Sequence, residues 1–218
     1  MKKFIFIFLV FSLFSAFANE HVKVIGKSEL EYHDHKTYEV WYDTTLHNPS
    51  FVIWDLTIDW VIEVEQRSIR PNSCFAQCKS APSENNYKDS SFDRGHMCPN
   101  ADMDFDEENS NNTFRTCNIC PQTPNLNRGE WKRVEKEERK LAKEHGLITI
   151  VCGPIYAKEP QKIGKDGIAI PKAFFKVFIW DGEIQVAYVF SNKKSENKKQ
   201  QVQNIEDITG LKFNVLKN

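Results

Sequence analysis

The order of strand-like and helix-like periodicity restricts the fold of this chain more than any other feature. From Trp54 to Val64 the even positions are Trp, Leu, Ile, Trp, Ile and Val, with mostly polar residues between them. This alternation predicts a long strand with one buried face. The clearest helix is predicted over Gly129–His145, where apolar residues recur at helical spacing and Gly146 can end it. A helix embedded between strands favours an α+β fold with a mainly antiparallel sheet.

Later segments support the same fold class. Further strands are predicted over Leu147–Cys152, Phe174–Trp180 and Ile184–Phe190. The Asp181-Gly182 pair between the last two predicts a hairpin turn. Gln200–Ile208 is predicted as a shorter helix. Because no internal repeat or low-complexity linker divides the sequence, we expect a single domain over residues 19–218.

The N-terminus has the pattern of a leader segment. Met1-Lys2-Lys3 is basic, Phe4–Phe14 is almost entirely apolar, and Ser15-Ala16-Phe17-Ala18 follows. This pattern predicts a signal peptide over residues 1–18 and a secreted or periplasmic protein without stable membrane association. The alternative is an N-terminal membrane anchor, which is disfavoured because the apolar run is shorter than a ~20-residue span.

The six cysteines are Cys74, Cys78, Cys98, Cys117, Cys120 and Cys152. In an exported chain they predict disulfides, with most cysteines paired, but the sequence does not choose the pairing. An alternative is a zinc site built from Cys74-x3-Cys78 and Cys117-x2-Cys120. His33-x-His35 could place two imidazoles on one strand face, but no third ligand is near in the sequence.

The charge balance limits how the chain could bind a polyanion. Lys and Arg number 29 and Asp and Glu number 30, which gives a formal net charge of −1. A protein that binds nucleic acid through its overall charge would be basic. Binding of nucleic acid would therefore need a local cluster of cations.

Residues 92–135 carry most of the chemical information. Phe92-Asp93-Arg94-Gly95-His96-Met97 places a guanidinium and an imidazole two residues apart, hence on the same side of an extended segment. Further along, Thr113–Gln122 contains Asn118-Ile119-Cys120-Pro121-Gln122, and Asn127-Arg128-Gly129-Glu130-Trp131 leads into the predicted helix.

These residues resemble the DNA/RNA non-specific endonuclease family, the ββα-metal nucleases that include endonuclease G. The family's Asp-Arg-Gly-His motif is matched at 93–96, its Asn-x-x-Pro-Gln at 118–122, and its Asn-x-Gly-x-Trp at 127–131. The similarity extends over roughly residues 47–213, and ordered motifs at matching separations are far more specific than one short match. The resemblance implies an α+β fold with an embedded ββα-metal motif.

The resemblance also implies the activity. It points to a Mg²⁺-dependent, sugar-non-specific endonuclease that hydrolyses DNA and RNA and leaves 5′-phosphate and 3′-hydroxyl ends, with Mn²⁺ as a substitute ion. DNA and RNA are then the expected partners, and a protein inhibitor of unknown identity is a further one. Two alternatives are a catalytically inactive nucleic-acid-binding module of the same fold and a cysteine-based redox or zinc protein.

Two residues carry the central roles that the resemblance implies. His96 would be the general base, because an imidazole can take a proton from water near neutral pH; the alternative is a buried structural histidine. Asn127 would be the protein ligand of the metal, because an amide oxygen is a hard donor suited to Mg²⁺. The alternative for Asn127 is a cap at the start of the helix.

The other positions have supporting roles. On an ideal helix Glu135 lies about 80° around and ~12 Å along from Asn127, which suits a water-mediated contact. Arg94 would hold the scissile phosphate. The resemblance adds Arg70 as a second arginine and Asn118 as an orienting residue. Contacts to the phosphate backbone are expected from Arg115, Arg128, Lys132 and Arg133.

Cysteine is where the sequence departs from the family. Cys98, Cys117 and Cys120 stand where many relatives carry small residues such as Ala, Ser or Thr. We expect some of them to form structural disulfides beside the site.

Overall fold

A seven-stranded antiparallel sheet is the centre of the molecule. The computed structural model describes residues 22–25, 29–66, 74–193 and 197–215. The strand order is β12-β11-β10-β7-β4-β3-β2. The bounds are β2 Glu31–Asp34, β3 Tyr38–Asp43, β4 Asn48–Thr57, β7 Leu147–Ile155, β10 Ala173–Trp180, β11 Glu183–Ser191 and β12 Asn197–Lys199.

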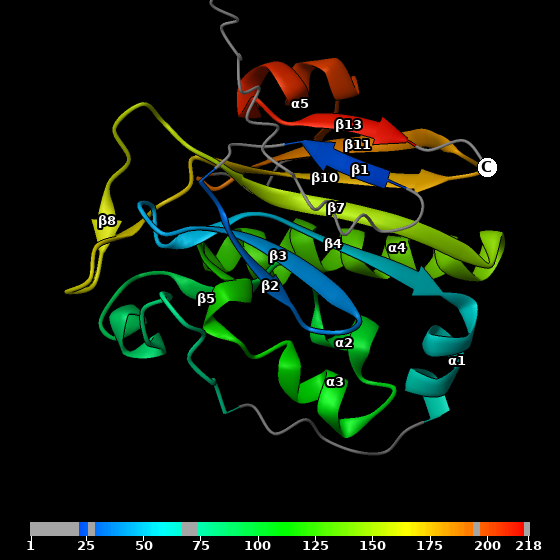
Figure 1. Cartoon of the computed structure of the whole chain (residues 1–218), viewed down its shortest axis with the longest axis horizontal. Coiled ribbons are helices and arrows are strands. Elements are labelled where there is room, and N and C mark those ends of the chain that lie inside the picture. The colour runs from blue at the N-terminus through cyan, green and yellow to red at the C-terminus, as the bar shows by residue number, and fades with distance from the viewer. Residues whose placement is uncertain (1–21, 26–28, 67–73, 194–196, 216–218) are drawn as a thin grey trace, which may run out of the picture.

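Both faces of this sheet are covered (Figure 1). One face packs against α4 (Lys132–His145), with α1 (Ile58–Gln66), α2 (Asn100–Met103) and α3 (Glu107–Asn112) beside it. The other packs against α5 (Val202–Thr209) and β13 (Lys212–Val215), which pairs with β1 (Val22–Ile25). In β4 the side chains of Val52, Trp54 and Leu56 enter the first core, and those of Phe51 and Ile53 enter the second. Strict alternation thus builds two cores on one sheet.

A small ββα unit sits on the α4 side of the sheet. Strand β5 (Asp93–His96) pairs antiparallel with β6 (Ile119–Gln122), and the chain then enters the π-helical turn η3 (Leu126–Trp131) and α4. Short 3-10 turns precede each strand of the pair, η1 at Glu84–Tyr87 and η2 at Thr116–Asn118, and a hairpin forms from β8 (Lys162–Ile163) and β9 (Ile168–Ala169). The predicted fold class, α+β with a mainly antiparallel sheet and an embedded ββα motif, is confirmed.

Several local predictions are also confirmed. The three later strands form β7, β10 and β11, and the predicted C-terminal helix forms α5. Asp181 and Gly182 both have positive φ, 53° and 68°, as the tight turn between β10 and β11 requires. Gly146 ends α4 with φ of 83°, and its N–H donates to the carbonyl of Ala142.

The long strand predicted over Trp54–Val64 is wrong in its second half. Strand β4 ends at Thr57 and α1 begins at Ile58. The Oγ1 of Thr57 accepts a hydrogen bond from the N–H of Trp60 at 3.3 Å, and Asp59 lies in the first helical turn. These are helix-starting features. The prediction is wrong because Ile58–Val64 is short and rich in apolar residues, so its pattern fits both the two-residue period of a strand and the 3.6-residue period of a helix.

The cysteines are mostly unpaired, which contradicts the expectation that most form disulfides. One disulfide, Cys78–Cys117, joins two segments 39 residues apart, and it confirms a disulfide beside the predicted site. Cys98, Cys120 and Cys152 are free and fully buried, and Cys74 is free and exposed. The three buried thiols pack as small apolar side chains in the core on the α4 side.

The predicted leader, residues 1–18, lies outside the described residues. Within the described ranges no helix has the length and apolar character needed to cross a membrane.

A buried ion pair attaches α4 to the sheet. Lys176 projects from β10, and its Nζ lies 2.7 Å from a carboxylate oxygen of Glu138 on α4. Both side chains have no exposed surface. The Lys176 ammonium also lies over the rings of Trp54 and Trp131, 5.3 and 4.6 Å from their centroids. The charge is therefore compensated by one carboxylate and two aromatic faces.

We predict that Lys176→Met destabilises the protein by about 3–5 kcal/mol, because it leaves the Glu138 carboxylate buried without a counter-charge. Urea unfolding measures the change. The double variant Lys176→Met/Glu138→Leu is the control, and its stability should return close to that of the wild type because neither charge of the pair remains. Equal losses in the single and double variants would contradict this account of the pair.

Candidate active site

The ββα unit places part of the matched motifs at one cavity. Arg94 lies on β5, and Asn127 and Arg128 lie on η3, which follows β6. These residues line a cavity of about 540 Å³ together with Phe75, Glu84, Asn85, Tyr87, Lys88, Phe92 and Asp93. Arg94 and the η3 residues, which are more than thirty positions apart in the sequence, therefore line the same cavity.

Asp93 connects the two sides of this cavity. Its carboxylate accepts two hydrogen bonds from the Arg128 guanidinium, at 2.8 and 2.7 Å, and one from the Asn127 amide at 3.0 Å. These hydrogen bonds, with those from Arg128 the stronger, hold the pKa of Asp93 below its usual value. Asp93 thus ties β5 to η3 and fixes the orientation of the Asn127 side chain.

Asn127 does not cap the helix, which removes the structural alternative for this residue. Its side chain donates to Asp93, and its N–H donates to the carbonyl of Thr123 at 2.9 Å. The segment from Asn127 to α4 is also not an ideal helix, because Gly129 breaks it with φ of −107° and ψ of −108°. The separation of Asn127 and Glu135 that assumes ideal helical geometry is therefore wrong.

His96 lies in an aromatic environment beside a cation. Its ring lies edge-on to Phe114, with centroids 4.9 Å apart, and 6.0 Å from the Phe75 ring. Burial, with a contribution from the positive charge of Arg94, lowers the pKa of His96 to about 4. Within the described part of the chain its Nε2 is buried and has no hydrogen-bond partner. His96 is therefore a neutral imidazole at pH 7, and it lies behind Arg94 rather than among the residues that line the cavity.

Asn118 and Trp131 hold the backbone next to His96. The Asn118 amide accepts a hydrogen bond from the N–H of Cys98 and donates to the carbonyls of Cys98 and Thr113, at 2.9, 2.9 and 3.0 Å. The Trp131 indole donates to the carbonyl of His96 at 3.2 Å. Asn118 is fully buried, so it acts on the site by positioning the chain rather than by contact with a substrate.

Glu135 lies on the first turn of α4 and is not one of the residues that line the cavity. Burial is the main cause that raises its pKa to about 7. The charged groups that interact with it are Lys176, Asp102, Arg139 and Lys132. Glu135 is therefore a carboxyl group that changes protonation near neutral pH beside the buried charges behind α4.

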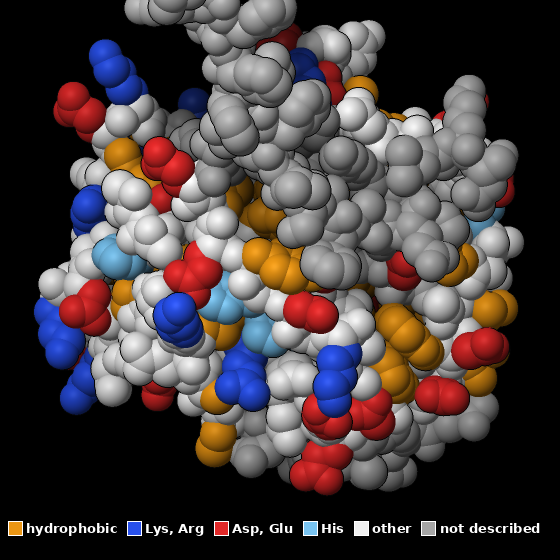
Figure 2. All heavy atoms as spheres, viewed as in Figure 1, with side chains coloured by type: hydrophobic (Ala, Val, Ile, Leu, Met, Phe, Trp, Pro, Cys, Tyr) orange, Lys and Arg blue, Asp and Glu red, His pale blue; other side chains and the backbone are white. Residues whose placement is uncertain are grey.

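The predicted cations differ in their environments. Arg94 is exposed, and its guanidinium lies over the Phe75 ring, 4.8 Å from the centroid. Arg128 pairs with Asp93, while Arg115 donates to Asn112 at 3.4 Å. Lys132 and Arg133 are exposed on α4, where Arg133 pairs with Glu130 and Glu137. Arg70 lies outside the described residues. Figure 2 shows basic and acidic side chains intermixed across the visible face, as the near-zero net charge predicts.

Two contributors were not predicted from the sequence. Phe75 contacts both Arg94 and His96, but no motif surrounds it and only tertiary folding brings it there. Asp93 was part of the matched motif without an assigned role, and its partner Arg128 is 35 residues away. The glycine between Arg94 and His96 also has a packing reason, because the Gln122 side chain occupies the space that a Cβ at Gly95 would need.

The sequence matches the family described as DNA/RNA non-specific endonuclease over residues 16–217. The chain belongs to this family. Its ββα unit therefore holds the matched motifs of a nuclease family, and the predicted resemblance is confirmed.

Individual relatives match over part of their length. Human mitochondrial endonuclease G is 32% identical over 49% of this chain and 40% of its own length. Mitochondrial nuclease 1 of Schizosaccharomyces pombe is 36% identical over 43% and 33%, and a nuclease of Nostoc sp. is 29% identical over 65% and 52%. The alignments thus span between a third and about half of these relatives.

A solved structure supports the fold of this family member. A crystal structure of an EndoG/EndoGI complex, which concerns the inhibition of EndoG, superposes with a TM-score of 0.74. It is 23% identical and covers 83% of this chain and 84% of that chain. At this identity the likeness establishes the fold alone.

The predicted secreted or periplasmic location is contradicted by the relatives. Those from Homo sapiens, S. pombe and Saccharomyces cerevisiae are named as mitochondrial proteins, whereas the name of the Nostoc relative states no location. A basic start followed by an apolar run indicates a targeting segment, but it does not identify the compartment. The compartment depends on which receptor recognises the segment.

We predict that the His96 imidazole titrates below pH 5 in the folded nuclease-family chain. Because the Arg94 charge disfavours the imidazolium, Arg94→Gln should raise the pKa of His96. The value should stay below 6.5 since burial is the larger cause. NMR titration of the imidazole C–H signals measures both values. A wild-type His96 pKa near 6.5 would show that burial does not act as described.

Proposed function

We propose that this protein is a metal-dependent endonuclease that hydrolyses phosphodiester bonds in DNA and RNA without base specificity. The observation that carries the proposal is the neutral His96 imidazole, with an unpartnered Nε2 in the described structure, on the strand that also carries Arg94 to the cavity. Membership of the nuclease family supports the same activity.

In this proposal His96 takes the proton from the attacking water. A base must be unprotonated to do this, and the lowered pKa keeps His96 neutral across the neutral pH range. The hydrogen bonds of Asn118 to Cys98 and of Trp131 to the His96 carbonyl fix the backbone that carries the imidazole. Arg94 is placed to bind a phosphate oxygen and to stabilise the charge that develops on phosphorus.

The surroundings of Asn127 fit a hard divalent cation. Its Nδ2 donates to Asp93, which leaves the amide Oδ1 for a ligand on the cavity side. The Asp93 carboxylate holds this amide in place, and its own charge is compensated by Arg128. A single neutral oxygen ligand in an open cavity suits Mg²⁺, which keeps most of its waters, and Mn²⁺ can use the same donor. Such an ion would supply stabilisation of negative charge on the leaving oxygen.

The cations around the cavity favour recognition of the nucleic-acid backbone. Arg94 and Lys88 line the cavity, and Lys132 is exposed on α4. Contacts from such cations to phosphates carry no base information. Arg128 is held by Asp93, so its first effect is to position η3, and a phosphate contact from it remains a proposal. A nuclease-fold module without catalysis would use the same cations but would not cleave.

We predict that His96→Ala lowers turnover by at least ~10²–10⁴-fold while binding of Mg²⁺ and substrate is retained. Asn127→Ala should weaken metal binding instead, so its activity should recover partly at high Mg²⁺. Nicking of supercoiled plasmid across a Mg²⁺ titration, with an EDTA blank, measures both effects.

Controls make this comparison specific. His145→Ala removes an exposed histidine from the far end of α4 and should cleave at the wild-type rate. Asn127→Ala also loses its hydrogen bond to Asp93, at a cost of about 1 kcal/mol, so all variants are compared at temperatures below their measured unfolding transitions. Full rescue of His96→Ala by added metal would show that His96 is not the base. A wild-type protein that binds plasmid without nicking it would favour the inactive module.

We further predict steep salt dependence of DNA binding, because a chain with a net charge of −1 must rely on local cations. The slope of log K against log salt should be near −0.9 per neutralised phosphate on duplex DNA. Binding of His96→Ala to a DNA duplex, followed by fluorescence anisotropy, measures this slope. Arg94→Gln should make the slope shallower by about the contribution of one neutralised phosphate. An affinity that does not change with salt would contradict binding through phosphate contacts.

A further inference from the structure

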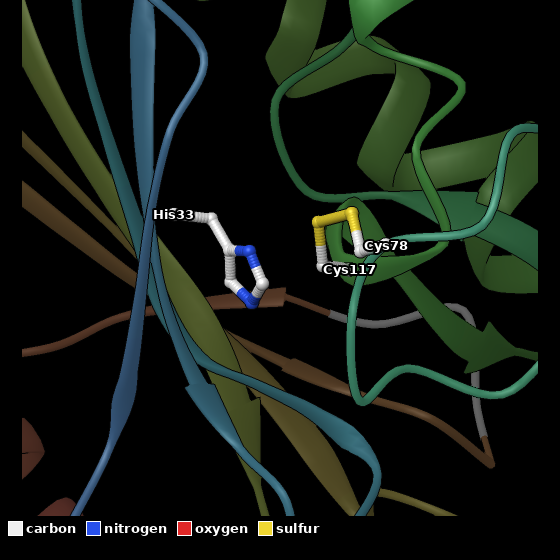
Figure 3. Close-up of side chains that lie close together, drawn as sticks. All are labelled: His33, Cys78 and Cys117. Carbon is white, nitrogen blue, oxygen red and sulfur yellow. A yellow bond between two sulfur atoms is a disulfide. The ribbon is translucent and has the colours of Figure 1, made fainter.

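Strand β2 brings two histidines against the Cys78–Cys117 disulfide. Metal-ligating atoms of His33, Cys78 and Cys117 lie within 4.8 Å of one another. The Nε2 of His35 lies 3.3 Å from the Cys117 sulfur. Figure 3 shows the His33 ring extending from β2 toward the two sulfurs, which belong to separate segments on the opposite side. Three donor groups thus lie within 4.8 Å of one another, and His35 adds a fourth donor beside the Cys117 sulfur.

We propose that reduction of the Cys78–Cys117 disulfide creates a structural zinc site formed by His33, His35, Cys78 and Cys117. Two thiolates and two imidazoles are a donor set that zinc binds tetrahedrally. With Zn–S near 2.3 Å and Zn–N near 2.0–2.1 Å, the ligand atoms of such a site lie roughly 3.3–3.8 Å apart. The 3.3 Å separation of His35 and Cys117 already falls in this range. The two sulfurs would move apart once their bond is reduced, and the His35 ring would move toward the His33 and Cys78 donors.

The alternation of β2 supplies the two imidazoles. His33 and His35 are two residues apart on a strand and share a face, and their rings are nearly parallel with centroids 6.3 Å apart. A carboxylate oxygen of Glu31 lies 3.4 Å from the Nε2 of His33. A carboxylate in this position orients a ligating imidazole and directs its other nitrogen to the metal. The cysteines are buried, with exposed fractions of 8% for Cys78 and 0% for Cys117.

The chemical change is balanced by a dithiol reductant of the thioredoxin class. The dithiol transfers two electrons and two protons to the Cys78–Cys117 bond, which becomes two thiols while the reductant becomes a disulfide. Zinc binding then releases the two thiol protons to solvent and forms two Zn–S bonds. With four protein ligands the coordination shell is closed, so the ion would be structural and separate from the proposed ion at Asn127.

Either linkage, disulfide or zinc, would hold the same segments. Cys117 directly precedes Asn118, and Cys78 follows three residues after Phe75, which contacts His96 and Arg94. The N–H of Cys78 also donates to Thr116 Oγ1 at 3.1 Å. A zinc ion would therefore connect β2 to the support of the candidate active site under reducing conditions, in which the disulfide is lost.

Cobalt binding to the full chain tests the site, because thiolate-to-cobalt charge-transfer absorption reports cysteine ligands specifically. The metal-free protein is reduced with a phosphine, and a second sample is kept oxidised. We expect the reduced protein to bind one Co²⁺ with a charge-transfer band that Zn²⁺ abolishes, and the oxidised protein to show no band. Zinc should also raise the unfolding temperature of the reduced protein and leave that of the oxidised protein unchanged.

Variants identify the ligands. His33→Ala and His35→Ala should each weaken zinc affinity by more than about 100-fold, and Cys78→Ser should remove most of the charge-transfer band. Cys74→Ser is the matched control, because Cys74 is free, exposed and four residues before Cys78, and it should bind like the wild type. The proposal fails if folded, reduced wild-type protein shows no charge-transfer band, or if Cys78→Ser and both histidine variants bind zinc as tightly as the wild type.

Discussion

The buried Lys176–Glu138 ion pair determines where α4 lies, and the rest of the site depends on that helix. The pair is fully desolvated between the sheet and α4, with Trp54 and Trp131 closing around the ammonium. Such a pair is stable only in good geometry, so it permits few other placements of the helix. Trp131 in turn donates to the carbonyl of His96. The same residue therefore links the position of α4 to the strand that carries the proposed base.

The parts of the fold that were predictable are those determined by local chemistry. The Asp181-Gly182 turn and the Gly146 helix end follow from residues that adopt positive φ, and β7, β10 and β11 follow from continuous apolar segments. The change from β4 to α1 at Thr57 was not predicted, because a short apolar run satisfies both periods. There the hydroxyl cap of Thr57 and the packing of α1 against α4 decide the structure.

The site was predictable as a set of residues but not as a set of contacts. The matched motifs identified His96, Asn118 and Asn127, and the structure brings all three into the ββα unit. Sequence reasoning could not show that Asp93 holds both Asn127 and Arg128, since these pairings depend on β5 meeting η3 in space. The same limit applies to the cysteines and β2 histidines. The sequence alternative grouped four cysteines in one zinc site, whereas the fold places one cysteine of each pair, Cys78 and Cys117, beside the histidines of β2.

The position of Arg94 beside His96 gives the proposed reaction a dependence on bound substrate. In the free protein the Arg94 charge adds to burial in lowering the pKa of His96, so the imidazole is neutral but weakly basic. A phosphodiester bound to Arg94 would bring one negative charge to the same place and cancel much of that effect. The pKa of His96 would then rise toward neutral pH, where a general base is most effective. In this arrangement His96 becomes a stronger base when a phosphate is in place than when water alone fills the cavity.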